Sequence, residues 1–331
     1  MKCPDSQCTP NAFIVQGQGI PWWPQCFNEN ATGLSRPWQL VLNNVQNFSL
    51  ANLTLLNPPN VFINCNNCVA GEIGPGLNLT AEWLCYDPDD PTGRCGCAEN
   101  FYPHLSGGAC SPPNTDGIDP GSGSHDLWIH DVFIWNGDDG IAIKPGFNEG
   151  TKGNAACTHD ILVEDCELHR GFGIPIGGVS VGCVENITFR NIRLLDSPGC
   201  GAWVKLQNGT DPDAHVSNIT YENLYMEDIR DKDYGCLSIS ALYFDQTYMG
   251  PYTPRVTDVT FRNITGVNCS AAGTFLCRAW APCTGIRLED VALKDSRAPF
   301  RCEHAAPDVA GFAHGTWEDV EPTPCLLPPT D

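Results

Sequence analysis

The sequence predicts an all-β fold, namely a single right-handed parallel β-helix that is rich in disulfides. Three observations lead to this prediction. A strand-like phrase returns along most of the 331 residues, Gly (33) and Pro (27) are abundant, and 19 cysteines are spread over the chain. Frequent Gly and Pro favour short strands and turns over long helices. Cysteines at this density are typical of disulfide-linked proteins of oxidising compartments.

The repeated phrase is about 14 residues long, and in each copy apolar residues alternate with polar ones. Copies begin at Asn44, Ser124, Thr158, Val184, Val216, Val256 and Cys283. Alternation with a period of two indicates strands. A short strand unit cannot bury its own apolar face, so repeats of this kind stack on their neighbours. β-Sandwiches and propellers are rival architectures, but they need shorter or more regular spacing and tight hairpin dipeptides, which are scarce here.

An Asn or Asp recurs at one position within the repeats, before another apolar residue. Examples are Asn191, Asn223, Asn263 and Asp290. A short polar side chain tolerates the left-handed backbone conformation and bonds the chain at a turn. We therefore expect these residues to form structural ladders on neighbouring coils.

The whole chain, residues 1–331, is predicted to be one β-helix domain. Residues 84–113 interrupt the repeats with Pro, Gly, Asp and Cys and indicate a loop insertion. Residues 297–331 are expected to cap the last coil, because a solenoid must cover its end. No apolar leader precedes the cysteines at the start, so we expect a signal peptide, and the first coil, to be missing from this numbering.

Composition limits the function. The formal net charge is −21, which disfavours nucleic-acid binding because such a surface repels phosphates. No apolar run reaches the roughly 18 residues of a membrane helix. Nine Asn-x-Ser/Thr sequons accompany the cysteines, and together they predict a secreted protein of the extracellular space. The sequons lie at Asn30, Asn47, Asn52, Asn78, Asn186, Asn208, Asn218, Asn263 and Asn268.

Three carboxylates on neighbouring coils are the candidate catalytic groups. Asp116 lies in NTDGIDP, whereas Asp138 and Asp139 lie in GDDGIAIK. Stacked coils place equivalent residues about 4.8 Å apart, so the three can share one exposed face. The chain must bend between Gly137 and Gly140 for both neighbouring aspartates to reach it. Such a cluster lets one carboxyl keep its proton while others stay ionised, as glycosidic cleavage requires. A solvated acidic turn or a calcium site is the alternative interpretation.

The ordered segments NTDGIDP, GDDGIAIK, RGFGIPIGG and AWVKLQNG resemble the motif set of the polygalacturonase family of pectin hydrolases, glycoside hydrolase family 28. GQGIPWW, RPWQL, FDQTY and CRAWAPCTGIRLEDVAL flank them, and the resemblance extends roughly from Ile14 to Cys325. It implies a pectin-lyase-like β-helix that cleaves α-1,4-galacturonosidic bonds with inversion. It also implies a pectic polysaccharide partner in the cell wall, a monomer, and no metal or other cofactor.

The resemblance assigns roles to individual residues. Asp138 is the general acid, while Asp116 and Asp139 hold and deprotonate the attacking water. Lys205 is implied to pair with a uronate carboxylate of the substrate, and Tyr248 to line a sugar subsite. Asn114 is implied to orient the catalytic carboxylates.

Two positions depart from the family pattern. Phe172 stands where the family has the His of GHG, and Trp203 stands where it has the Arg of RIK. Phe cannot donate a hydrogen bond, and Trp offers stacking in place of a bidentate fork. His169 and Arg170 are close in sequence and are candidates to substitute for the missing groups, although a pair of exposed turn residues is an equal alternative.

Three functions remain open at this point. The leading one is hydrolysis of galacturonan. The second is hydrolysis of a rhamnogalacturonan or xylogalacturonan backbone, which the loss of Arg at Trp203 favours. The third is wall-polysaccharide binding with little catalysis, which Phe172 favours.

Disulfide pairs follow in part from the resemblance. The family's plant members close small loops late in the chain, which implies Cys277–Cys283 and Cys302–Cys325. We further expect Cys166–Cys183 to bracket the glycine segment.

Overall fold

The protein is a parallel β-helix in a computed structural model. The structure describes residues 13–23, 35–82, 84–85, 109–110, 112–145, 157–241, 243 and 250–310. Strands and turns make up these segments, and none of them contains a helix that is long and apolar enough to cross a membrane. The predicted all-β class and parallel β-helix are confirmed.

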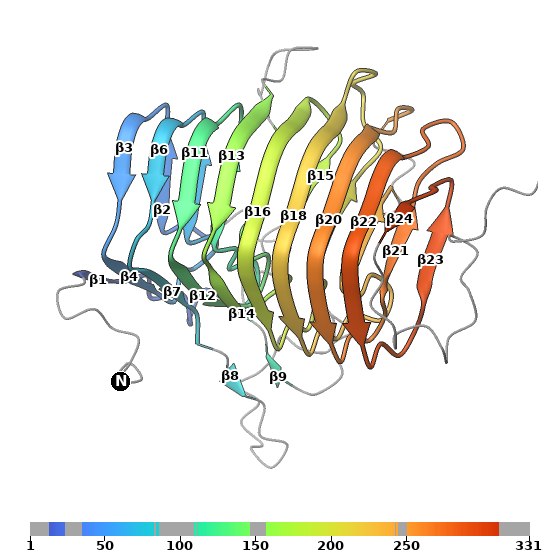
Figure 1. Cartoon of the computed structure of the whole chain (residues 1–331). Helices are drawn as coiled ribbons and strands as arrows, with labels where there is room; N and C mark the ends of the chain where they lie inside the picture. The colour runs from blue at the N-terminus through green and yellow to red at the C-terminus, as the bar shows by residue number, and fades with distance from the viewer. Residues whose placement is uncertain are drawn as a thin grey trace, which may run out of the picture.

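Two rows of short parallel strands begin the solenoid and merge into long strands (Figure 1). One row contains β3 (Gln46–Leu50), β6 (Val69–Ile73), β11 (His125–His130) and β13 (Thr158–Glu164). The other contains β1 (Phe13–Gln16), β4 (Leu53–Leu56), β7 (Leu77–Thr80), β12 (Val132–Asn136) and β14 (Glu167–Arg170).

Four long strands continue both rows, because each pairs along its whole length with the next coil. They are β16 (Cys183–Leu195), β18 (His215–Glu227), β20 (Arg255–Val267) and β22 (Thr284–Lys294), with the short β24 (Asp308–Ala310) beside β22. Figure 1 shows β16, β18, β20 and β22 side by side.

A third parallel face carries the residues of interest. Its first part is β2 (Leu40–Asn43), β5 (Ile63–Asn66) and β10 (Ile118–Gly121). Its second part is β15 (Ile174–Val179), β17 (Ala202–Leu206), β19 (Leu237–Ser240), β21 (Gly273–Leu276) and β23 (Phe300–Glu303). Isolated bridges Ile118–Ile141 and Ile143–Ile176 connect the two parts.

The recurrent Asn and Asp residues form the expected ladders. Asn191, Asn223 and Asn263 have φ of 51° to 55°, which is the left-handed region. Asn263 Nδ2 donates to Asn223 Oδ1 at 2.7 Å, and Asn223 Nδ2 donates to Asn191 Oδ1 at 3.0 Å. Each of these amide side chains therefore forms a hydrogen bond with the equivalent side chain on the preceding coil, which connects the exposed turns.

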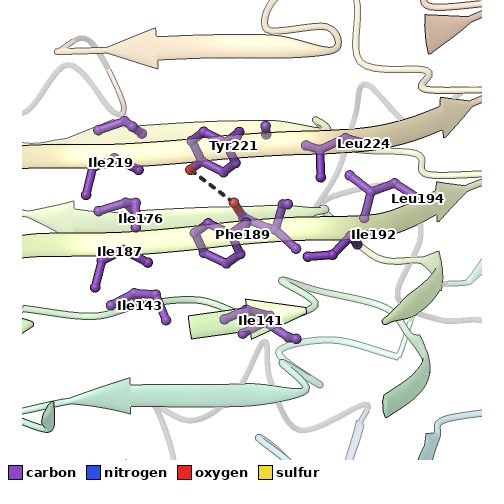
Figure 2. Close-up of a cluster of buried hydrophobic side chains, with 14 of the residues drawn as sticks. Ile141, Ile143, Ile176, Ile187, Phe189, Ile192, Leu194, Ile219, Tyr221 and Leu224 are labelled. Carbon is purple, nitrogen blue, oxygen red and sulfur yellow. Dashed lines mark hydrogen bonds between the residues drawn. The ribbon is translucent and has the colours of Figure 1, made fainter. Parts of the chain in front are cut away.

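The core consists of the inward residues of all three faces, stacked like with like from coil to coil. Phe189, Tyr221 and Phe261 form one such stack, with ring centroids 5.0 and 5.1 Å apart. Figure 2 shows Phe189 and Tyr221 among buried isoleucines and leucines of neighbouring coils. Close packing of this kind fixes the register of the coils and thus the positions of outward side chains.

Two segments that the sequence sets apart from the repeats are described only in part. Within the predicted 84–113 insertion, β8 (Leu84–Cys85) pairs antiparallel with β9 (Ala109–Cys110), and most other residues lie outside the described part. Within the predicted 297–331 cap, β23 pairs with β21 and β24 pairs with β22, so the first residues of this segment continue two faces of the solenoid. Phe300 of β23 is buried and stacks on Phe275 of the preceding coil at 5.2 Å. Residues 311–331 are outside the described part.

One disulfide prediction is confirmed and one is wrong. Cys277 pairs with Cys283 as expected, and a further disulfide joins Cys236 to Cys269. Cys183, however, pairs with Cys157 and not with Cys166.

Strand register explains the correction. Thr158 of β13 lies opposite Val184 of β16, so the residues just before them, Cys157 and Cys183, are also neighbours, with Cα atoms 4.6 Å apart. Cys166 is buried in the turn after β13, where its Sγ contacts the carbonyl oxygen of Glu164 at 3.1 Å. The predicted Cys302–Cys325 pair involves Cys325, which is outside the described residues.

Candidate active site

Three aspartates meet at the junction between the two parts of the third face. Asp116 lies just before β10, while Asp138 and Asp139 lie just before the bridging residues Ile141 and Ile143. One carboxylate oxygen from each lies within 4.8 Å of the others. The structure thus brings together the three residues proposed from the sequence as acid and base.

The chain bends at residues 137–140, which brings two consecutive aspartates to one side. The side chain of Asn136 stabilises this bend by donating to three carbonyl oxygens, those of Thr115 (2.9 Å), Asp138 (3.0 Å) and Asp139 (2.7 Å). The Thr115 hydroxyl also accepts from the backbone N–H of Gly137 at 2.9 Å. Gly140 is required here, because a Cβ would lie 2.8 Å from the backbone carbonyl oxygen of Gly173 as well as 2.3 Å from the Leu168 side chain.

The carboxylates are nearly buried, which differs from the exposed face expected from the sequence. Asp116, Asp138 and Asp139 are between 3% and 8% exposed, and Asp119 of β10 is buried beside them. Burial strengthens the mutual repulsion of charges, because less water screens them. The cluster therefore needs positive partners or protons.

Two lysines provide the positive charge. Lys205 Nζ lies 2.6 and 2.7 Å from the two carboxylate oxygens of Asp139. Lys144 Nζ lies 3.1 Å from Asp116, 3.4 Å from Asp139 and 3.5 Å from Asp119. The strong pairing raises the pKa of both ammonium groups despite their burial, so they stay charged. Four carboxyl groups thus surround two ammonium groups, an imbalance that favours retention of protons.

Asp138 is a carboxyl that retains its proton near neutral pH. Burial, with the neighbouring charges of Asp116 and Asp139, raises the pKa of Asp138 to about 7. Burial also raises the pKa of Asp119 well above its usual value, against the effect of Lys144. A protonated Asp138 beside lysine-paired carboxylates is the division of states that acid and base catalysis requires.

A polar side chain links Asp138 to the preceding coil. Asn114 Nδ2 lies 3.4 Å from Asp138 Oδ2, and Arg36 donates to Asn114 Oδ1 at 2.6 Å. Arg36 also donates to the carbonyl oxygen of Pro113 at 2.9 Å, which fixes its guanidinium. Asn114 is therefore held toward the predicted acid, in the orienting position that its motif implies.

Lys205 and Trp203 lie beside the carboxylates, but Lys205 is occupied. Its ammonium group is nearly buried against Asp139 and lies 4.6 Å from the Trp203 ring centroid. Tyr234 and Tyr243 complete an aromatic enclosure, with ring centroids 4.4 and 5.1 Å from that of Trp203. The indole Nε1 of Trp203 is buried and has no hydrogen-bond partner within the part of the chain that the structure describes. This region is aromatic and has no guanidinium at the position of Trp203.

Phe172 lies next to the predicted acid through its backbone, since its N–H donates to the carbonyl oxygen of Asp138 at 2.9 Å. His169 does not replace the missing His. It belongs to β14, bonds Glu167 at 2.8 Å and stacks on Trp135. The guanidinium of Arg170 pairs with Asp196 at 2.8 Å. Tyr248 lies outside the described residues.

The three aspartates also form a possible cation site, since their oxygens converge. Hard cations such as calcium bind six to eight oxygen ligands. Here, the ammonium groups of Lys144 and Lys205 already contact Asp116 and Asp139. Charge compensation by lysine fits the donor set better than a cation does.

The sequence alone did not identify Arg36, Asp119 and Asn136 as members of the site. It also did not identify Lys144 as a direct partner of the carboxylates. Lys144 and Asp119 lie within the quoted motifs, each directly after an inward-facing isoleucine. This alternation could have indicated that their side chains point to the same side as the aspartates. Asn136 acts on backbone atoms and Arg36 arrives from a distant coil, and neither contact has a local sequence signature.

The fold and the site define a class: a parallel β-helix with a nearly buried cluster of aspartates on its third face. The sequence matches the family model described as "Glycosyl hydrolases family 28" over residues 11–311. The chain belongs to this family.

Relatives with assigned names share modest identity with the chain. A polygalacturonase of Chamaecyparis obtusa is 28% identical over 330 residues, which cover 94% of this chain and 54% of that protein. A probable rhamnogalacturonase C of Aspergillus niger is 26% identical over 291 residues, covering 85% and 52%. The chain thus spans about half the length of these curated relatives.

A solved structure shares the fold. The endo-xylogalacturonan hydrolase from Aspergillus tubingensis superposes with a TM-score of 0.62 at 21% identity, covering 88% of this chain and 71% of that one.

Proposed function

We propose that the protein is a secreted hydrolase of pectic polysaccharides that cleaves α-1,4-galacturonosidic bonds. The observation that carries the proposal is the unequal state of the clustered carboxyls. Asp138 has a pKa of about 7, while Asp116 and Asp139 contact lysine ammonium groups. Membership of the glycosyl hydrolase family supports the reaction class.

In the proposed reaction, Asp138 donates its proton to the glycosidic oxygen as the bond to the anomeric carbon breaks. A water attacks that carbon from the opposite face and gives its proton to Asp116 or Asp139. Asp138 ends ionised and one base carboxyl ends protonated, so atoms and charge balance. Lys205 contacts Asp139, and Lys144 contacts Asp116 and Asp139, so positive charge lies beside the carboxyl groups that receive this proton.

Inversion at the anomeric carbon is part of the proposal. Carboxyl groups of inverting enzymes are commonly about 6.5–9.5 Å apart, and those of retaining enzymes about 5–5.5 Å. Oxygens within 4.8 Å of one another are closer than most inverting pairs. The anomeric configuration of the first product, followed by proton NMR, therefore tests this step: a β product supports inversion and an α product refutes it.

A second candidate substrate is a decorated or mixed backbone, such as xylogalacturonan or rhamnogalacturonan. Trp203 favours it, because an indole in place of a guanidinium cannot form a bidentate pair with a uronate carboxylate. Lys205 is occupied by Asp139, which further reduces the cationic character of the site. The names of the Aspergillus relatives are consistent with either backbone.

The deciding experiment measures reducing ends released from polygalacturonate, xylogalacturonan and rhamnogalacturonan, with Asp138→Asn as the inactive control. Release from polygalacturonate at the highest rate supports the leading function, and a higher rate on another backbone supports the second. Binding without release from any of them would refute hydrolysis and leave the binding function suggested by Phe172.

A further inference from the structure

Two exposed aromatic side chains lie near each other on loops that follow the strands of the catalytic face. Trp280 is 68% exposed and Tyr252 is 45% exposed. Pro251, Ala279 and Pro282 are exposed next to them in the chain. Exposed apolar groups gathered in this way mark interaction sites more often than isolated ones do.

Hydrogen bonds connect these loops to the strand that carries Lys205. Trp280 Nε1 donates to Thr253 Oγ1 at 3.2 Å, and Thr253 Oγ1 donates to Asn208 Oδ1 at 2.8 Å. Asn208 follows Lys205 by three residues, and Gly209 bonds Tyr252 through the backbone. The aromatic loops are therefore continuous with the C-terminal end of β17.

Strand order sets the distance from the catalytic centre. β21, which leads into the Trp280 loop, is two strands beyond β17 and four beyond the segment that contains Ile143. With about 4.8 Å between strands, the loop lies roughly 10 Å along the axis from Lys205 and roughly 19 Å from the coil of Asp138 and Asp139. A polymer lying along the axis would reach both places.

The loop is rigid before any ligand arrives. The disulfide Cys277–Cys283 closes it, and Arg278 and Ala281 exchange backbone hydrogen bonds across it, of 3.0 and 3.4 Å. A preorganised loop loses little conformational entropy on binding.

Arg278 gives the aromatic surface a positive charge. Its guanidinium carbon lies 5.7 Å from the Trp280 ring centroid, and no carboxylate pairs with it in the described parts of the chain. Its Nε is buried and has no hydrogen-bond partner among the described residues. A cation without an acidic partner is notable in a chain of net charge −21.

We propose that Trp280, Tyr252 and Arg278 form a remote subsite for an acidic polysaccharide, separate from the catalytic carboxylates. The aromatic rings present flat apolar surfaces to the C–H faces of pyranose rings, and Arg278 pairs with a uronate carboxylate. The occupant is a distant part of the same polysaccharide molecule that is being cleaved, so this inference rests on the proposed function. The subsite increases affinity for long chains and leaves the chemistry at Asp138 unchanged.

Calorimetric titration in an Asp138→Asn background tests this inference, with long polygalacturonate and with digalacturonate as probes. Trp280→Ala and Arg278→Gln are each expected to weaken binding of the long polymer at least fivefold and to leave digalacturonate binding unchanged. Trp128→Ala is the matched control, because Trp128 is also exposed but lies on β11 of another face. Should Trp280→Ala fold poorly, Trp280→Phe keeps an aromatic ring and is expected to weaken binding less than Arg278→Gln.

Equal polymer affinity in the parent, Trp280→Ala and Arg278→Gln proteins would overturn the subsite. Loss of binding that is the same for digalacturonate and polymer would also overturn it, since it would indicate a general defect. A protein that binds the polymer through Trp280 but hydrolyses no pectic substrate retains the subsite and refutes the proposed function alone.

Discussion

The Asn ladder and the aspartate cluster are built from similar residues on stacked coils, yet their properties are opposite. In the ladder, Asn191, Asn223 and Asn263 are exposed, and each amide bonds the next. In the cluster, Asp138 and the neighbouring aspartates are nearly buried, and their carboxyl groups lie close together. Stacking alone therefore produces structure, whereas stacking with burial and an excess of carboxyl groups produces a group with a perturbed pKa.

The largest expected effect distinguishes the cluster from the ladder directly. Asp138→Asn keeps the shape of the side chain but cannot donate the proton, so kcat should fall by about 10²–10⁴. Asn191→Ala removes a ladder rung and should leave kcat unchanged. Initial rates on the best pectic substrate measure both. A ladder variant as inactive as Asp138→Asn would remove the distinction.

The ladder variant, which should not affect kcat, should instead lower the stability of the fold. Asn191→Ala loses hydrogen bonds and strains a left-handed residue, which should lower the free energy of unfolding by about 1–3 kcal/mol. Asn191→Gly accepts that backbone conformation and should lose less. Urea denaturation of the three proteins, wild type included, measures the difference. Equal stability of the Ala and Gly variants would show that backbone conformation contributes nothing there.

Proton linkage at Asp138 predicts a second contrast. The unfolded carboxyl releases its proton near pH 4, whereas the folded one holds it to about pH 7. The folded state therefore binds more protons between these values, and the free energy of unfolding should fall as pH rises from 4 to 7, by up to about 4 kcal/mol from this group. Asp138→Asn should remove most of that slope. A slope that is equal in both proteins would contradict the shifted pKa.

Lys144 tests the role of the positive partners. Lys144→Met removes the ammonium group that contacts Asp116, Asp119 and Asp139, which should lower the free energy of unfolding by about 3 kcal/mol and lower kcat. Urea denaturation and initial rates measure the two effects, with Lys294→Met on the exposed end of β22 as the control. A Lys144→Met protein as stable and as active as wild type would show that this ammonium group does not compensate the carboxyl cluster.

The smallest expected effect is at the position of the missing His. Phe172→His restores the residue type of the family pattern at a position whose backbone N–H bonds the carbonyl oxygen of Asp138. We expect a change of only a few-fold in kcat, because the acid is already positioned by Asn114. Rates of this variant and wild type measure it. A gain of a hundredfold or more would instead indicate that wild type lacks an essential group.

The repeated alternation predicted the strands and the Asn slot because both depend on short-range pattern. Ladder positions such as Asn223 follow from the repeat itself. Cys166–Cys183 failed because register between coils, which pairs Cys157 with Cys183, depends on the length of each turn. The burial of Asp138 and the pairing of Lys205 with Asp139 also escaped prediction. They arise from residues brought together across four coils, and no local period reports them.

The central claim is that Asp138 holds the catalytic proton. Carbon-13 NMR of protein labelled at the aspartate carboxyl groups, titrated from pH 3 to 9, measures this directly by comparison with Asp138→Asn. The account predicts one resonance with a pKa of about 7 that is present in wild type and missing in the variant. If the resonance lost in Asp138→Asn titrates near 4, Asp138 is ionised at working pH and is not the acid.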